Sequence, residues 1–172
     1  MSDSLPVYLL DSDVLIQAHR MYYAFDICHG FWESLQHHHR ENRLYSIAHV
    51  KDEIKGGLKD ALFTWAYDTM PSSFFQKADN LDVLAAYSEI IRWVQSEKFT
   101  EAAKEEFAKS ADGWIIAFSK AKNYSVVTCE TYEKDRRNKV KIPNVCLQFN
   151  VPCIDTFTLL RDLKTQFSWK KP

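Results

Sequence analysis

VYLLD, residues 7–11, is the stretch that decides the fold, because an apolar run ends there directly in the acid Asp11. The run has no polar alternation, as expected of a strand that is covered on both faces in a parallel sheet. A second stretch of this kind, SVVTCE at residues 125–130, ends in Glu130. Ligand sites in parallel α/β sheets form outside the carboxyl ends of the strands. The two acids are therefore expected at the same edge of one sheet.

Helical segments separate the apolar stretches. Apolar spacing and capping residues predict helices at residues 14–20, 25–39, 47–55, 58–70, 82–97, 100–109, 112–122 and 155–167. A very short strand or a turn is expected at residues 44–46, and a final strand at residues 151–154. Strands separated by helices indicate parallel pairing with right-handed crossovers. The sequence therefore predicts an α/β fold with a small, mainly parallel central sheet, and residues 1–172 are expected to form one domain.

Local signals refine this prediction. Asp13 is a candidate cap for the helix at residues 14–20, and Ser46 for the helix at residues 47–55. Trp32 and Trp169 are candidate surface aromatics that could stack on bases or pack on a partner. One face of the helix at residues 82–97 is expected to be buried through its apolar residues Leu81, Leu84, Ala85, Ile91 and Val94.

Composition excludes several classes of protein. The chain carries 22 basic and 23 acidic residues, so its net charge of −1 indicates neither nucleic-acid nor membrane binding by the chain as a whole. No apolar stretch approaches the roughly 20 residues that span a bilayer, and residues 1–4 lack the features of a signal peptide. The four cysteines form no C-x-x-C pair, which argues against a disulfide framework or a cysteine zinc site. A cytoplasmic protein without membrane contact is expected.

Four acids stand where a parallel sheet would bring them together. Asp11 and Glu130 follow the two apolar strands, Glu53 lies in a helical stretch, and Asp112 opens another. Clustered carboxylates repel one another, and a hard divalent cation is the usual remedy. Each acid alone has an ordinary interpretation: a helix cap for Asp11, a solvated residue for Glu53, a charge favourable to the helix dipole for Asp112, and a loop residue for Glu130.

Four segments taken in order resemble the motifs of PIN-domain nucleases. They are LDSDVLI at residues 10–16, VKDEI at 50–54, ADGWIIA at 111–117 and VVTCE at 126–130. The resemblance implies a three-layer α/β/α sandwich and an acidic pocket that binds Mg²⁺ or Mn²⁺. It also implies an endoribonuclease that acts on RNA as the toxin of a toxin–antitoxin pair, with an antitoxin protein as partner and a homodimer as a possible assembly. The stretch KIPNVC, residues 141–146, is similar to a divergent branch of PIN-like proteins.

The resemblance assigns the metal and catalytic residues one by one. Asp11 matches the acid of the first strand, Glu53 the helical glutamate, and Asp112 the acid that opens the later helix. Glu130 stands where the family usually has aspartate, and its longer side chain favours contact with the metal through water. Asp13, in a position that is often asparagine, is either a fifth acid or a helix cap, and Thr128 is a supporting residue.

A basic run follows the fourth acid. Lys134, Arg136, Arg137 and Lys139 are expected to contact the phosphates of a nucleic acid beside the acidic pocket. The alternative is an exposed, charged helix without a ligand.

Two other functions fit parts of the pattern. The pair Asp11 and Asp13 after a strand, with Thr128, imitates a haloacid-dehalogenase-like phosphatase. Against it stand Leu15 in the fifth motif position and the lack of a paired acidic motif after residue 130. The other alternative is a catalytically inactive PIN-like binding module, for which Glu130 is the only hint.

Overall fold

The computed structural model describes residues 5–171, so the N-terminal residues 1–4 considered above lie outside it. Its centre is a five-stranded parallel sheet in the order β3-β2-β1-β4-β5. The strands are β1 (Tyr8–Leu10), β2 (Leu44–Ile47), β3 (Phe75–Gln76), β4 (Ser125–Val127) and β5 (Cys153–Ile154). The predicted α/β class with a small parallel sheet is confirmed.

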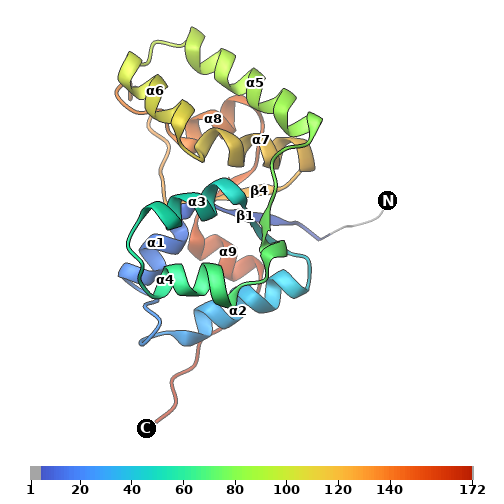
Figure 1. The fold of residues 1–172 in the computed structure, drawn as a ribbon, viewed down its shortest axis with the longest axis vertical. Helices are drawn as coiled ribbons and strands as arrows, with labels where there is room; N and C mark the ends of the chain where they lie inside the picture. The colour runs from blue at the N-terminus through green and yellow to red at the C-terminus, as the bar shows by residue number, and fades with distance from the viewer. Residues whose placement is uncertain (1–4, 172) are drawn as a thin grey trace.

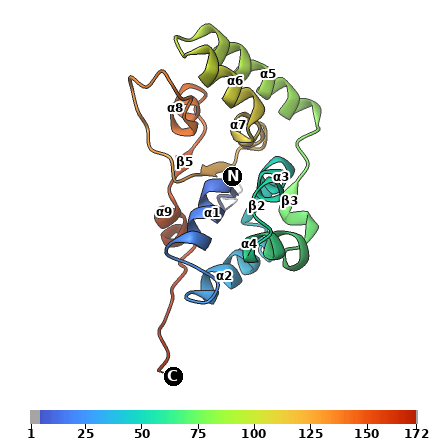
Figure 2. The same ribbon diagram turned by 60° about the vertical axis from the view of Figure 1, so that its left-hand side comes forward.

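Helices surround this sheet on both sides. They are α1 (Ser12–Arg20), α2 (His29–Arg40), α3 (Ala48–Gly56), α4 (Ala61–Thr64), α5 (Leu81–Ser96), α6 (Glu101–Lys109), α7 (Asp112–Lys122), α8 (Ile142–Gln148) and α9 (Thr156–Asp162). Figures 1 and 2 both show α5 to α8 gathered on one side of the sheet, and α1, α2, α4 and α9 on the other. The arrangement is a three-layer α/β/α sandwich.

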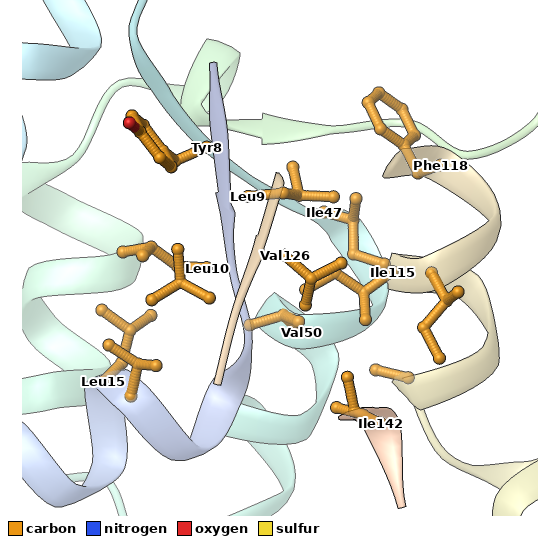
Figure 3. Packing of buried hydrophobic residues seen from close by; sticks show 14 of the residues in the cluster. Tyr8, Leu9, Leu10, Leu15, Ile47, Val50, Ile115, Phe118, Val126 and Ile142 are labelled. Carbon is orange, nitrogen blue, oxygen red and sulfur yellow. The ribbon is translucent and has the colours of Figure 1, made fainter. Parts of the chain in front are cut away.

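Strand β1 lies at the centre of the core. Leu9 and Leu10 are fully buried, and side chains of successive strand residues point to opposite faces. Figure 3 shows Leu9 on the side of Ile115 of α7, whereas Leu10 lies on the side of Leu15 of α1. One short strand therefore packs against both helical layers, and this explains why its residues are apolar on both faces.

The register of β1 and β4 determines where their acids lie. Leu10 pairs with Val127, so the next residues along, Asp11 and Thr128, leave the sheet side by side. The backbone continues this pairing for one more step, because the N–H of Asp11 donates to the carbonyl oxygen of Val127 at 3.0 Å.

Neither of the two candidate residues caps its helix. Helix α1 begins at Ser12, and its cap is Asp11, whose carboxylate accepts from the N–H of Ser12; Asp13 lies inside the first turn. Ser46 belongs to β2, and its hydroxyl donates to the carbonyl oxygen of Leu10 at 2.7 Å. Serine is a common helix cap, but Ser46 instead forms a hydrogen bond at the carboxyl end of β1. A buried polar side chain needs a hydrogen-bond partner, and the packing here provides this one.

The buried face of α5 differs from the expected one. Its buried residues are Val83, Ala86, Ile90 and Val94, whereas Leu81 is 82% and Leu84 39% exposed. The helix carries apolar residues around more than half of its circumference, so spacing alone allows two faces. Packing against α7 selects between them.

Other elements are shorter than expected or were not predicted. The helix expected at residues 58–70 consists of α4 and a π-helical turn at Trp65–Thr69, and α9 ends at Asp162. Strand β3 and helix α8 were not predicted. Trp32 is buried rather than a surface residue, because it stacks on Phe25 at 4.0 Å and its indole N–H donates to the carbonyl oxygen of Tyr23.

Among residues 5–171, no helix combines the length and the apolar character that crossing a membrane would require.

The position of Leu9 leads to a stability prediction. Leu9→Ala should lower the free energy of unfolding by about 2–5 kcal/mol, because it leaves a cavity between the sheet and α7. The control Leu81→Ala, at an exposed position, should change it by less than about 0.5 kcal/mol. Urea denaturation of the three proteins measures both values, and equal effects of the two substitutions would contradict a core centred on β1.

Candidate functional site

Asp11 is buried at the end of β1, with only 3% of its surface exposed. One carboxylate oxygen accepts from the N–H of Ser12 at 2.7 Å, and the other lies 3.3 Å from the hydroxyl of Thr128. Burial holds the pKa of Asp11 well above its ordinary value, and repulsion from Asp13 and Asp112 adds to the shift. Asp11 therefore caps α1 and, at the same time, lies where burial and neighbouring carboxylates disfavour its charged form.

Asp13 faces the same threonine from the first turn of α1. Its carboxylate accepts from the N–H of Cys129 at 3.0 Å and lies 3.1 Å from the hydroxyl of Thr128. The hydroxyl has a single proton and cannot donate to Asp11 and Asp13 at the same time. Burial raises the pKa of Asp13, and the Cys129 N–H acts in the opposite direction. Asp13 is thus a member of the cluster and does not cap the helix.

Asp112 brings a third carboxylate from the first position of α7. Burial, together with repulsion from Glu130 and Glu53, raises the pKa of Asp112 to about 7, while Lys139 acts in the opposite direction. A carboxyl group with this pKa exchanges its proton near neutral pH. Burial is the main cause of this raised pKa, and the neighbouring carboxylates add to it.

Glu130 follows β4 and is held by two protein groups. One oxygen pairs with the ammonium of Lys139 at 2.7 Å, and the other accepts from the N–H of Ile142 at 2.8 Å. The longer side chain of glutamate lets it reach the start of α8. Lys139 was expected to contact nucleic acid, but in this structure it neutralises an acid of the cluster.

Glu53 approaches the cluster from α3. Its carboxylate accepts from the N–H of Ala111 at 2.8 Å, directly before Asp112. The same side chain lines a cavity of about 270 Å³, whose other walls include His49, Lys109 and Trp114. The predicted acids therefore converge at the carboxyl edge of β1 and β4, where each of them influences or contacts another member.

The donor chemistry of this cluster suits a hard divalent cation. Asp11, Asp13 and Asp112 supply only carboxylate oxygens, and burial, with repulsion from neighbouring acids, raises the pKa values of all three. Within residues 5–171, no group of three or more His, Cys, Asp or Glu side chains is placed so that it could hold a metal ion as the side chains stand. Glu53 and Glu130 instead hold backbone N–H groups.

The basic run is a loop with turns, and the alternative of an exposed helix is wrong. Its Lys139 pairs with Glu130 at 2.7 Å, and Lys141, directly after the run, pairs with Glu133 at 2.7 Å. Lys134, Arg136 and Arg137, which follow Glu130 along the chain, line a cavity of about 270 Å³.

Sequence patterns missed two features of this region. The ion pair of Lys139 with Glu130 spans nine positions of an irregular loop, for which no periodicity exists. The cavity beside Arg137 includes Trp93 and Tyr132, and only the fold brings α5 next to the loop. The one available signal was the density of basic and aromatic residues after Glu130.

The fold resembles that of a solved structure, "Crystal Structure of FitAcB from Neisseria gonorrhoeae". The two chains are 18% identical, with a TM-score of 0.53 over 86% of this chain and 96% of the other. This likeness supports a PIN-like fold.

A search of curated proteins finds no match to the chain. A family model described as "Domain of unknown function (DUF4411)" matches residues 8–167, which include every element from β1 to α9. The chain therefore belongs to the DUF4411 family.

Proposed function

We propose that the protein is a metal-dependent endoribonuclease that cleaves phosphodiester bonds of RNA. The convergence of Asp11, Asp13 and Asp112 at the carboxyl edge of the sheet carries this proposal. Asp11 and Asp13 both face the hydroxyl of Thr128, and Asp112 lies close enough to repel Asp11, so a surplus of acidic groups is gathered in one buried place. Retaining such a surplus costs stability, and a structural role does not require it. The PIN-like fold and the order of the acidic motifs support the same interpretation.

Asp11, Glu53, Asp112 and Glu130 would hold the ion, with Asp13 in support. Mg²⁺ or Mn²⁺ bound there would position the scissile phosphate, lower the pKa of a bound water and stabilise charge on the attacking and leaving oxygens. Glu53 and Glu130 each have a protein partner, which favours contact through water for these two residues.

The remaining groups orient and balance the carboxylates. Thr128 and the N–H of Cys129 fix the side chain of Asp13, and Ser12 fixes that of Asp11. Lys139 compensates the charge of Glu130 and thereby lowers the repulsion on Asp112. In the metal-free protein the pKa of Asp112 is about 7, and a cation bound beside it would favour the ionised carboxylate. No nucleophilic side chain is needed, because water is the attacking group in this mechanism.

The biological role follows from the resemblance to PIN-domain nucleases. We propose that the protein is the toxin of a toxin–antitoxin pair, acting in the cytoplasm, with an antitoxin protein as partner. A homodimer belongs to the same proposal. Nothing in the acidic cluster itself encodes this regulation.

The phosphatase and the inactive binding module are separated from this proposal by one assay. The protein is incubated with Mg²⁺ or Mn²⁺ and either a structured RNA or a generic phosphomonoester. Cleavage of RNA supports the nuclease, release of phosphate alone supports the phosphatase, and neither reaction supports the inactive module.

Asp112→Asn should abolish RNA cleavage while it preserves the fold. The substitution keeps the shape and removes one charge, and a loss of roughly 100-fold or more is expected, because partners of metal ligands already contribute about 10- to 100-fold. The exposed Asp26 provides a matched control, since Asp26→Asn should leave cleavage unchanged. Initial rates with saturating Mg²⁺ measure the effect, and wild-type cleavage by Asp112→Asn would overturn the proposed site.

Mg²⁺ should stabilise the wild type by binding only to its folded form. At a concentration about 100 times the dissociation constant, the gain is about 2.7 kcal/mol, or roughly 5–10 °C in melting temperature. Asp112→Asn should show a much smaller rise, and Asp26→Asn the full one. Thermal melts with EDTA and with Mg²⁺ measure this difference, and equal rises in all three proteins would place the ion elsewhere.

The pKa of Asp112 makes the stability of the metal-free protein depend on pH. Between about pH 4 and pH 7 the folded state holds a proton that the unfolded state has lost, since the pKa is about 7 in the first and about 3.9 in the second. Unfolding free energy should therefore fall as pH rises through this window, by a few kcal/mol at most, and level off above it.

In Asp112→Asn this fall should be smaller, with a remainder from Asp11 and Asp13, whose pKa values are raised in the same direction. Urea denaturation in EDTA at several pH values compares the two proteins. Parallel profiles would show that Asp112 is not the titrating group.

A further inference from the structure

A cavity of about 270 Å³ lies between the end of α5, helix α8 and the loop that follows Glu130. Its lining includes Trp93, Tyr132, Lys134, Arg136, Arg137 and Gln148. The cavity is distinct from the acidic cluster, none of whose carboxylates lines it.

The charge of this cavity is positive. Lys134, Arg136 and Arg137 line it, against the single carboxylate of Glu97. Arg136 is paired with Glu133 at 3.1 Å, but within residues 5–171 neither Lys134 nor Arg137 forms a salt bridge. Two cations are thus free to bind an anion such as a phosphate group.

Aromatic surface lies next to these cations. Tyr132 is 51% exposed, and Trp93 is half-buried with Phe99 and Phe149 packed edge-to-face against it. Aromatic rings beside cations form the combination that binds unpaired nucleotides, because bases stack on the rings while the cations contact the phosphates. The exposed amide of Gln148 adds a hydrogen-bonding group.

The walls of the cavity are anchored to the rest of the fold. The carbonyl oxygen of Arg137 accepts from the N–H of Thr100 at 2.9 Å. The side chain of Asn144 accepts from the N–H of Glu133 at 3.1 Å and donates to its carbonyl oxygen at 2.7 Å. These bonds hold the loop against α6 and α8, so the cavity is preorganised.

The same loop and helix connect the cavity to the acidic cluster. Tyr132 follows Glu130 by two residues, which limits the distance between their Cα atoms to about 7 Å. Glu130 itself contacts the first residue of α8, Ile142, two positions before Asn144. A chain of nucleotides could therefore reach from one site to the other.

We propose that this cavity binds one unpaired nucleotide of the RNA substrate next to the cleavage site. The base stacks on Tyr132 and Trp93, and a phosphate contacts Arg137 and Lys134. The volume, just below the roughly 300–1,000 Å³ of pockets for drug-sized ligands, suits one nucleotide. This inference rests on the proposed function. Binding of an unpaired base in the cavity would make the protein selective for single-stranded over paired RNA.

Binding of a labelled, unstructured RNA in EDTA, followed by fluorescence anisotropy, tests the cavity without any cleavage. Tyr132→Leu should weaken binding roughly 10-fold through loss of stacking. Arg137→Ala should also weaken it and reduce the log–log salt slope by about 0.7. Matched controls at exposed positions outside the cavity, Tyr22→Leu and Arg40→Ala, should bind like the wild type. Thermal melts confirm that each variant is folded.

A series of RNAs with one abasic nucleotide, moved along the strand, tests the stacked base directly. One position should weaken binding to the wild type and have no further effect on Tyr132→Leu, because both changes remove the same contact. Additive effects at every position, or unchanged affinity of Tyr132→Leu, would overturn the proposal.

The proposed function fails separately from the cavity. If the protein cleaves RNA with Mg²⁺ but its RNA affinity is unchanged by substitution of Tyr132 and Arg137, only the proposed role of the cavity is overturned. Binding through both residues without any cleavage would support the cavity as an RNA site and overturn the nuclease.

Discussion

The parallel pairing of β1 with β4 is the constraint on which the rest of the structure depends. Because Leu10 lies opposite Val127, Asp11 and Thr128 leave the sheet side by side, and the first turn of α1 brings Asp13 to the same hydroxyl. The two strands also hold the core, with Leu9, Leu10, Val126 and Val127 fully buried. The same few residues thus build the centre of the fold and place the acids at its edge.

The acidic cluster is in tension with this core. Burial and mutual repulsion raise the pKa values of Asp11, Asp13 and Asp112, so the metal-free protein gives up stability that neutral residues would provide. Only part of the charge is compensated, by Lys139 at Glu130 and by backbone N–H groups at Glu53 and Asp13. Such local conflicts with stability are expected where a protein binds a ligand.

The loop after Glu130 connects the two sites. It begins at an acid of the cluster, contributes Tyr132, Lys134 and Arg137 to the neighbouring cavity, and returns through Lys139 to Glu130. In the proposed function, cleavage and RNA selection are thus neighbouring tasks of one segment. Their electrostatics are opposite, because one site needs a cation to accept phosphate and the other supplies its own cations.

Sequence alone determined the two central strands, the parallel α/β class and the acids, because buried parallel strands are apolar throughout and site residues follow them directly. The tertiary structure decided what depends on partners far along the chain. Packing on α7 determined which face of α5 is buried. The hydroxyl of Ser46 bonds to the carboxyl end of β1 and does not cap a helix. The ion pair of Lys139 with Glu130, and the approach of α5 to the loop at Tyr132, follow no periodic pattern in the sequence. Only folding brings these groups within range of one another.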